Sequence, residues 1–306
     1  MVVTLTPNPM WETTFPVPAI GSTGSQRLNA GVRQLTGKGI NVVRALANLG
    51  HDGLGLLPGD DKTPRHATDV NYEVINLGIT PRVGFVLVDP EGANNTYYEK
   101  GPTWTTDQAD ALVDQIKERV QQLQPDTVVL AGSLPPGLPT NIYERIAQAL
   151  RPSVACLVLD AVGPALESAL SARPDLVKVN RTEFIATFGK SPSSEDEYAN
   201  ALLDLSRNHG VSACAVTAGS GAAFFCLDGR IFRAIPAEIE VRNSVGSGDS
   251  LLAGWLANRD ADHESLIRAA VGAGCANAEQ LGVAVFEKER AEALAAQVLV
   301  TEIETS

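Results

Sequence analysis

Hydrophobic residues follow two alternating patterns through the middle of the chain. Some runs are apolar at almost every position, which is typical of strands buried on both faces of a sheet. Between them, apolar residues recur every three or four positions, as in helices that pack on one side. The predicted strands are 127–131, 154–159, 175–179 and 211–217, and the predicted helices are 105–123, 141–150, 164–170 and 195–208. This alternation indicates an α/β fold with a mostly parallel sheet covered on both faces.

The two ends of the chain extend this pattern. The further predicted elements are a first strand at 2–6, a helix at 39–49, a hairpin of 222–227 with 230–235, and helix almost throughout from 247 onward. Gly50 just past the end of the second element is a usual helix stop signal.

A small β element is predicted outside this body. Residues 10–36 carry prolines and glycines and show no helical period, whereas 83–88 form a continuous apolar run that turns back toward 96–98. We therefore expect a β lid built from about 10–36 and 79–104. No repeat or linker divides the rest, so 1–306 is interpreted as a single domain with a lid.

Composition narrows the functional classes. The 306 residues include 36 acidic and 24 basic side chains, a formal charge of -12, which disfavours binding to nucleic acid or to an anionic membrane. The four cysteines and four histidines show no metal-binding spacing. No run approaches the about 18 apolar residues of a membrane span, so we expect a cytoplasmic protein.

The most informative stretch is NSVGSGDSLLAGWL at 243–256. Gly246 and Gly248 permit a tight turn into a helix, whose first N–H groups suit an anion or a developing negative charge. The stretch is neither GxGxxG, because the third position is Leu251, nor the GxxxxGK[ST] of a P-loop. Asp249 is either a helix cap or partner of the helix dipole, or a general base that takes a proton beside these amides.

Other candidate residues follow predicted strands. Ligands of doubly wound sheets lie beyond the carboxyl ends of the strands, so loops at those ends converge on one site. The loops are 7–9, 132–137, 178–183, 217–219 and the turn at Gly246. Lys38, between Gly37 and Gly39 at a helix start, adds a cation next to flexible backbone.

Five motifs in order resemble one known family. They are TLTPNP at 4–9, GKGINVVRALANLG at 37–50, VVLAGSLPPGLP at 128–139, DLVKVNRTE at 175–183 and NSVGSGDSLLAGWL at 243–256. Together they look like the ribokinase-like PfkB carbohydrate kinases, in the branch of 1-phosphofructokinase and tagatose-6-phosphate kinase. The resemblance implies a three-layer α/β/α body with a mostly parallel sheet and a β lid. It also implies transfer of the ATP γ-phosphoryl group to a sugar hydroxyl.

The same resemblance assigns roles to residues. Asp249 matches the catalytic base, and Gly246, Ser247 and Gly248 match the anion hole. The positions that match acceptor-sugar contacts are Glu12, Gly37, Lys38, Gly39, Asn41, Arg82 and Ser133, with Lys38 and Arg82 expected on the phosphate already carried by the sugar. The positions that match contacts to ATP are Lys178, Asn180, Glu183, Thr217, Gly219 and Asn277, with Asn180 and Glu183 also expected to hold Mg²⁺ through water.

Departures from the family pattern gather at the acceptor end. Glu12 stands where Asp is usual, Thr36 where Gly is usual and Gly84 where Asn is expected, and Tyr98 stands near another expected Asn. The residues therefore favour kinase chemistry more firmly than they favour one acceptor.

Several functions remain open from the sequence. Our first hypothesis is a kinase of a phosphorylated ketohexose, with fructose 1-phosphate as the first acceptor to test. Tagatose 6-phosphate, fructose 6-phosphate, an unphosphorylated sugar and a nucleoside are alternatives. A catalytically silent protein that binds sugar phosphate or nucleotide is the non-enzyme alternative. A homodimer through the lid is also predicted, since short strands with an apolar face are a common pairing surface.

Overall fold

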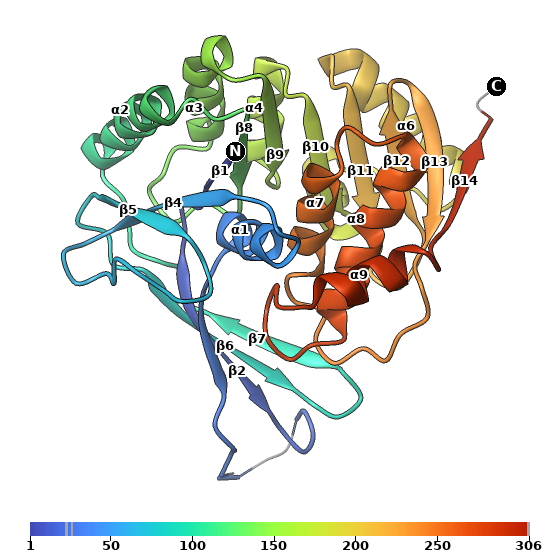
Figure 1. The fold of residues 1–306 in the computed structure, drawn as a ribbon. Coiled ribbons are helices and arrows are strands. Elements are labelled where there is room, and N and C mark those ends of the chain that lie inside the picture. The colour runs from blue at the N-terminus through green and yellow to red at the C-terminus, as the bar shows by residue number, and fades with distance from the viewer. Residues whose placement is uncertain (22–23, 26, 305–306) are drawn as a thin grey trace.

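A large twisted sheet forms the centre of the molecule (Figure 1). The computed structural model describes residues 1–21, 24–25 and 27–304. In that part of the chain the sheet has ten strands in the order β14-β13-β12-β11-β10-β9-β8-β1-β4-β5. Their bounds are β1 Val2–Leu5, β4 Gly53–Gly59, β5 Tyr72–Asn76, β8 Thr127–Ala131, β9 Cys156–Asp160, β10 Leu176–Asn180, β11 Ala213–Thr217, β12 Ala223–Leu227, β13 Arg230–Ile235 and β14 Leu299–Ile303.

The seven of these strands that come first in the chain run parallel, namely β1, β4, β5, β8, β9, β10 and β11. The strands β12, β13 and β14 complete one edge in antiparallel pairs. The strand order reverses at β1, which has β4 on one side and β8 on the other. Such a reversal opens a crevice at the carboxyl ends of the strands, where ligands bind in doubly wound sheets. The topology therefore places the candidate site beside the ends of β1, β8, β9 and β10.

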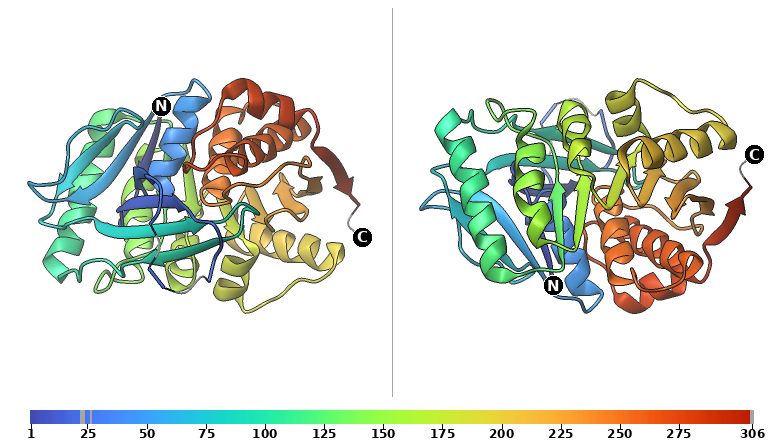
Figure 2. Two further views of the ribbon diagram at one scale, coloured as in Figure 1. Left: turned by 90° about the horizontal axis from the view of Figure 1, so that it is seen from below. Right: turned by 90° about the horizontal axis from the view of Figure 1, so that it is seen from above.

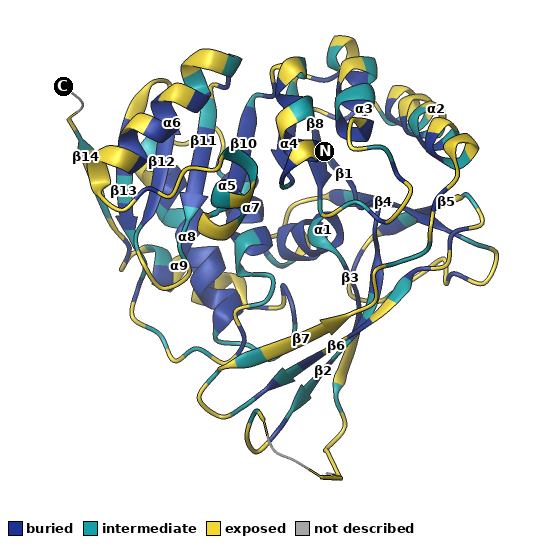
Figure 3. Cartoon of the chain, turned by 180° about the vertical axis from the view of Figure 1, so that it is seen from behind, coloured by how far each residue is buried: buried dark blue, intermediate teal, exposed yellow. Residues whose placement is uncertain are grey.

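Helices cover both faces of the sheet, as the views from below and above show (Figure 2). One hydrophobic core lies under α2 (Thr106–Leu123), α3 (Ile142–Leu150), α4 (Pro164–Ala169), α5 (Arg181–Phe188) and α6 (Glu195–His209). A second core lies under α1 (Lys38–Asn48), α7 (Ser247–Ala257), α8 (His263–Ala278) and α9 (Lys288–Ala295). The central strands between them are buried almost throughout (Figure 3). The predicted three-layer α/β/α body with a mostly parallel sheet is confirmed.

A separate four-stranded sheet, called the lid below, has the order β3-β2-β6-β7. Its strands are β2 Met10–Pro16, β3 Val32–Thr36, β6 Arg82–Val88 and β7 Asn94–Tyr98. Register places four residues in one row across it: Gln34, Glu12, Gly84 and Tyr98. The face that carries this row turns toward the body, because Glu12 and Gln34 are both buried.

Three elements were missed or misjudged from the pattern of hydrophobic residues. The chain after residue 247 is not helix to its end, because β14 pairs antiparallel with β13. The short strand β5 pairs with β4 after a connection without a helix, and α5 begins at Arg181 directly after β10. Each is five to eight residues long, too short for a periodic signal.

No helix in the described ranges is long and apolar enough to cross a membrane.

Candidate active site

Asp249 lies in the first turn of α7, beyond the end of the central strands. The helix begins after Gly246, whose φ of 83° is left-handed, and within the described residues no side chain caps it. The Asp249 carboxylate instead accepts a hydrogen bond from Asn41 Nδ2 at 2.7 Å. Asp249 is thus not the helix cap that its position alone also allowed, and its carboxylate is turned to the site.

The turn that leads into Asp249, residues 246–249, depends on its two glycines, and we call it the anion-binding turn. A Cβ on Gly246 would lie 2.6 Å from Val283 Cγ1, and a Cβ on Gly248 would lie 2.6 Å from Lys178 Nζ. The Ser247 N–H donates to the Ser244 carbonyl, whereas no acceptor among the described residues takes the N–H groups of Gly248 and Asp249. These free donors at the positive end of a helix suit the negative charge of a phosphoryl group.

A cluster of opposite charges lies next to Asp249, and we call Lys38, Asp160, Lys178 and Glu183 the charge cluster. Asp160 is fully buried at the end of β9, and its two oxygens accept from Lys38 Nζ at 2.5 Å and Lys178 Nζ at 2.9 Å. Lys38 Nζ also donates to Glu183 Oε1 at 2.6 Å. Every charged group in the cluster is therefore paired, as buried charges need to be.

Asp160 was not identified as a site residue from the sequence. The predicted strand 154–159 ends one residue before it, although a carboxylate directly after a buried parallel strand is a signal for a site residue. Burial alone would lower the pKa of Lys38, but Asp160 and Glu183 raise it above its ordinary value. Lys38 therefore remains a cation in the site.

The pKa of Asp249 is raised to about 6. Burial is the largest cause, and the negative charge of Asp160 adds to it, while Lys178, Lys38 and the hydrogen bond from Asn41 act in the opposite direction. A carboxylate with this pKa is ionised at neutral pH and holds a proton more readily than an exposed aspartate. These are the properties of a general base that works near neutral pH.

Asn41 is fixed by a buried arginine that the sequence reading did not single out. Arg44 Nη1 donates to Asn41 Oδ1 at 3.3 Å, which leaves the Asn41 amide nitrogen for Asp249. Arg44 also donates to the Leu35 carbonyl at 2.6 Å and pairs with Asp69 at 2.9 Å. In this structure the Asn41 oxygen binds Arg44 and its nitrogen binds Asp249, and the expected contact with a sugar hydroxyl stays a prediction.

Asn180 and Glu183 form a reciprocal cap at the start of α5. Asn180 Oδ1 accepts from the Glu183 N–H at 2.8 Å, and Glu183 Oε2 accepts from the Asn180 N–H at 2.9 Å. Among the described residues, no group of three or more His, Cys, Asp or Glu side chains could hold a metal ion alone. Oxygen donors that already bind lysines and amides fit an Mg²⁺ ion held largely by water and phosphate oxygens. The predicted magnesium contacts remain predictions.

Two of the residues predicted to contact the acceptor, Glu12 and Arg82, lie on the lid. Glu12 is buried, and its Oε1 finds no hydrogen-bond partner in the described part of the chain. Burial raises the pKa of Glu12, while a hydrogen bond with Tyr98 and the charges of Arg44 and Arg82 counteract this shift. Arg82 Nη1 donates to the Glu99 carbonyl at 2.8 Å, but its buried Nε has no partner among the described residues.

The aromatic ring of Tyr98 fits because position 84 has no side chain. A Cβ on Gly84 would lie 2.7 Å from Tyr98 Cδ1 and 2.3 Å from Met10 Sδ. The Arg82 guanidinium lies over the same ring, 5.5 Å from its centroid. The departures Glu12, Gly84 and Tyr98 are therefore neighbours that form one surface. Thr36, the fourth departure, is buried and donates to the Met10 carbonyl at 3.4 Å.

The predicted phosphate contacts Lys38 and Arg82 occupy different parts of the site. Lys38 belongs to the charge cluster at the body, whereas Arg82 lies on the lid with Tyr98 and Glu99. Across the described residues, no hydrogen bond or ion pair links them. Gly37 and Gly39 pack the start of α1 against Thr6, since a Cβ on either would lie 2.5 Å from its side chain.

The remaining predicted residues lie at strand ends or under the anion-binding turn. Ser133 follows β8, and Thr217, at the end of β11, is paired in register with Asn180. Gly219 follows with a left-handed φ of 61°. Asn277 is fully buried in α8, and its Nδ2 donates to Ser247 Oγ at 2.9 Å and to the Val245 carbonyl at 3.0 Å. Asn277 was expected to contact ATP, and in this structure its amide holds the turn.

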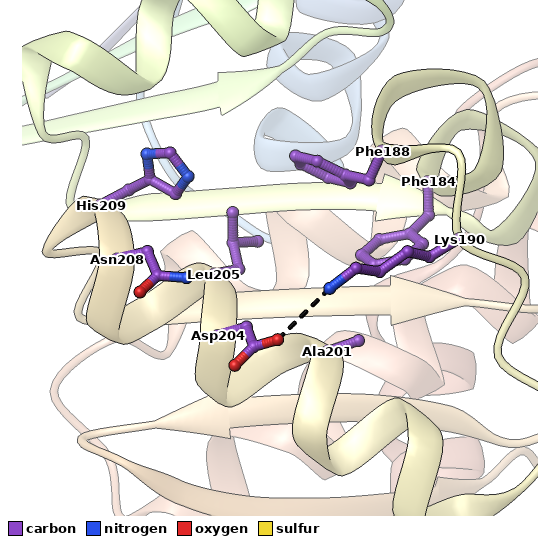
Figure 4. Close-up of a pocket in the computed structure, with 8 residues that line it drawn as sticks. All are labelled: Phe184, Phe188, Lys190, Ala201, Asp204, Leu205, Asn208 and His209. Carbon is purple, nitrogen blue, oxygen red and sulfur yellow. Dashed lines mark hydrogen bonds and ion pairs between the residues drawn. The ribbon is translucent and has the colours of Figure 1, made fainter.

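A separate hollow lies between α5 and α6 (Figure 4). Phe184 and Phe188 form one side, and Lys190 reaches Asp204 at 3.3 Å across it. None of the predicted site residues lines this hollow. The buried charges and free amides, rather than this hollow, therefore define the candidate site.

The chain is similar to known proteins over almost its whole length. A model described as pfkB family carbohydrate kinase matches residues 15–290. The chain is 31% identical to a 1-phosphofructokinase of Rhodobacter capsulatus over 94% of this chain and 91% of that protein. It is also 31% identical to a 1-phosphofructokinase of Bacillus subtilis, over 94% of this chain and 97% of that protein. The tetrameric inhibited form of phosphofructokinase-2 from Escherichia coli has the same fold, with a TM-score of 0.84 at 23% identity over 96% of this chain and 98% of that one.

The fold and the site define a phosphotransferase that acts on a small molecule. The chain belongs to the pfkB family of carbohydrate kinases. It is an ATP-dependent sugar kinase, and the predicted family, fold class and enzyme class are confirmed.

Proposed function

We propose that this kinase transfers the γ-phosphoryl group of ATP to a hydroxyl of a phosphorylated ketohexose, with fructose 1-phosphate as the first acceptor. The observation that carries the proposal is Asp249, a buried carboxylate of raised pKa beside free helix amides and two lysines. The two 1-phosphofructokinases that match nearly the whole chain support the choice of acceptor.

The transfer step follows from this arrangement. Asn41 occupies Asp249 Oδ2, so Oδ1 receives the proton as the acceptor oxygen attacks the γ-phosphorus and the bond to the leaving ADP breaks. The N–H groups of Gly248 and Asp249 stabilise the negative charge on the transferring group. Lys38 and Lys178 contribute positive charge from the charge cluster. Magnesium, when bound near Asn180 and Glu183, neutralises charge on the phosphates.

Two buried polar atoms of the lid lack hydrogen-bond partners among the described residues, and they support a sugar phosphate as the acceptor. Glu12 Oε1 would accept a hydrogen bond from a sugar hydroxyl, and Arg82 Nε would donate to the phosphate on the sugar. Lys38 would meet the same acceptor from the side of the body.

The test is ADP release from Mg-ATP against a panel of free and phosphorylated ketohexoses, pentoses and nucleosides. We expect turnover with fructose 1-phosphate and a loss of at least ~10²- to 10⁴-fold in Asp249→Asn, with ATP binding retained. Asp107→Asn is the control, because it removes a carboxylate from the first turn of α2, away from the site. Unchanged turnover in Asp249→Asn contradicts the assignment. Turnover only with another acceptor corrects the substrate, and ATP binding with no turnover on any acceptor favours a catalytically silent binding protein.

We also propose that the enzyme works in the cytoplasm, where ATP and sugar phosphates are found, and forms a homodimer through the outer face of the lid. That face exposes Val83, Phe85 and Tyr97, with Phe85 stacked on Phe15 at 6.3 Å. A monomeric mass at micromolar concentration contradicts the dimer.

A further inference from the structure

One polar side chain of the lid reaches the segment that supports the anion-binding turn. Gln34, in β3, is nine-tenths buried and pairs in register with Glu12. Its Oε1 accepts from the Val283 N–H at 2.9 Å, and its Nε2 donates to the Val283 carbonyl at 3.3 Å. A glutamine that satisfies both backbone groups of one residue acts like a short piece of added strand, because it matches donor with acceptor and acceptor with donor.

The segment held by Gln34 contacts the anion-binding turn directly. Val283 packs against Gly246, where an added Cβ would lie 2.6 Å from its Cγ1. The next N–H, of Ala284, donates to Asn277 Oδ1 at 2.6 Å. Since Asn277 Nδ2 donates to Ser247 Oγ and the Val245 carbonyl, a continuous series of contacts leads from the lid to the free amides.

The segment depends on these contacts for its shape. Ala284 has a φ of 55°, a left-handed conformation that non-glycine residues adopt at a cost. Asn48 in α1 holds the same segment from the body, by donating to the Ala284 carbonyl at 2.8 Å. Gln34 is therefore the contact from the lid, and Asn48 the matching contact from the body.

We propose that Gln34 is a positioning residue that couples the acceptor-binding face of the lid to the anion-binding turn. Glu12, its neighbour across the β2–β3 ladder, is the predicted sugar contact, so an acceptor that orders Glu12 also orders Gln34 and through it Val283. Through Gln34, the conformation of the turn at Gly246 thus depends on whether an acceptor is bound at the lid. The coupling to acceptor binding rests on the function proposed above, whereas the structural link to the turn does not.

The link is tested first without any substrate. Hydrogen exchange of the free protein is compared for wild type, Gln34→Leu and Asn48→Ala. We expect at least about tenfold faster exchange at the Ala284 and Ser250 amides in Gln34→Leu. Both amides lie beyond the bonds that Gln34 itself makes, because they donate to Asn277 Oδ1 and the Gly246 carbonyl. Unchanged exchange at these amides in a folded Gln34→Leu overturns the proposal, whether or not fructose 1-phosphate is the acceptor.

The second test separates coupling from a general loss of packing. With fructose 1-phosphate and Mg-ATP, Gln34→Leu should lower kcat at least about tenfold with little change in ATP affinity. In Asn48→Ala, fructose 1-phosphate should still slow exchange at Ala284, whereas in Gln34→Leu it should not. Equal slowing in both variants overturns the coupling. If wild type turns over fructose 1-phosphate but its exchange at Ala284 is not slowed, the coupling is overturned. If wild type does not turn it over, that acceptor is refuted, and the free-protein result alone decides the structural link.

A third variant tests the hydrogen bonds themselves. A protonated carboxyl in Gln34→Glu can donate to the Val283 carbonyl as the amide does, whereas the ionised form repels that oxygen. Burial beside the Glu12 carboxylate raises the pKa of the introduced group. The ratio of kcat in this variant to that in wild type, taken at each pH, should therefore rise by about fivefold or more from pH 8 to pH 6. A constant ratio overturns the role of these bonds.

Discussion

The charge cluster and the inner face of the lid differ in how completely their polar groups are paired. At the body, Asp160 binds both Lys38 and Lys178, and Glu183 binds Lys38. On the lid, Glu12 Oε1 and Arg82 Nε are buried and lack partners within the described residues. A buried polar group without a partner costs about 1–3 kcal/mol, so the lid holds groups that gain most from a ligand.

This difference separates two tasks of one site. Paired charges are held in place before the reaction, and fixed dipoles and charges are what stabilise a transition state without reorganisation. The unpaired groups on the lid would gain their hydrogen bonds from a molecule that binds there. Under the proposed function, the body would carry the chemistry and the lid would select the acceptor.

The largest effects should come from removing one cation on each side. Lys38→Met leaves Asp160 and Glu183 without a shared partner. We expect turnover of every acceptor to fall at least about 100-fold, because several close charges are unbalanced.

Arg82→Met should raise KM at least about tenfold for phosphorylated acceptors, with kcat within a few-fold. Steady-state kinetics on fructose 1-phosphate and fructose measure both. A Lys38→Met defect confined to phosphorylated acceptors would instead make Lys38 a dedicated phosphate ligand.

A smaller effect is expected from a single hydroxyl on the lid. Tyr98→Phe removes the hydroxyl that lowers the pKa of Glu12 and keeps the ring under Arg82. We expect a loss of about three- to tenfold in kcat/KM for the acceptor, the usual value of one hydrogen bond. Tyr97→Phe, on the exposed face of the same strand, is the control and should stay within about twofold. Equal behaviour of the two variants would remove Tyr98 from the acceptor surface.

The smallest effect concerns stability and pH. Because folding raises the pKa of Asp249 from 3.8 to about 6, ionised Asp249 opposes folding above that pH, and the penalty disappears below about pH 4. Asp249→Asn should therefore unfold less readily than wild type at pH 8, by at most about 3 kcal/mol, and the advantage should vanish toward pH 4. Urea titrations at the two pH values measure it. An advantage that is independent of pH would contradict the raised pKa.

The sequence was sufficient to predict the body and the position of Asp249, the candidate base, in the first turn of a helix. The helix with Asn41 and the turn at Gly246 carry strong local signals, namely periodic apolar residues and glycines at sharp turns. Strand ends then converge by topology, since parallel strands place their carboxyl ends along one edge.

The residues that were missed act through partners far away in the chain. Asp160, Arg44 and Gln34 looked like ordinary polar residues, and their importance comes from contacts with residues 122, 25 and 249 positions away, respectively. The lid surface of Glu12, Gly84 and Tyr98 was noticed as a set of departures, but only the register of three strands makes them neighbours. Spatial pairing of this kind leaves no periodic trace in a single sequence.

The distance between Gln34 and Val283 in the chain has a consequence for biosynthesis. At roughly 5–20 residues per second, a ribosome adds Val283 roughly ten to fifty seconds after Gln34. Once β7 has been added, the four lid strands are present for the rest of that interval without the segment at Val283, and Gln34 has only water in place of the Val283 backbone. A nascent or shortened chain that stops before residue 283 therefore carries the predicted acceptor-binding residues without the segment that supports the turn at Gly246. Kinase activity should emerge as a single late event in synthesis.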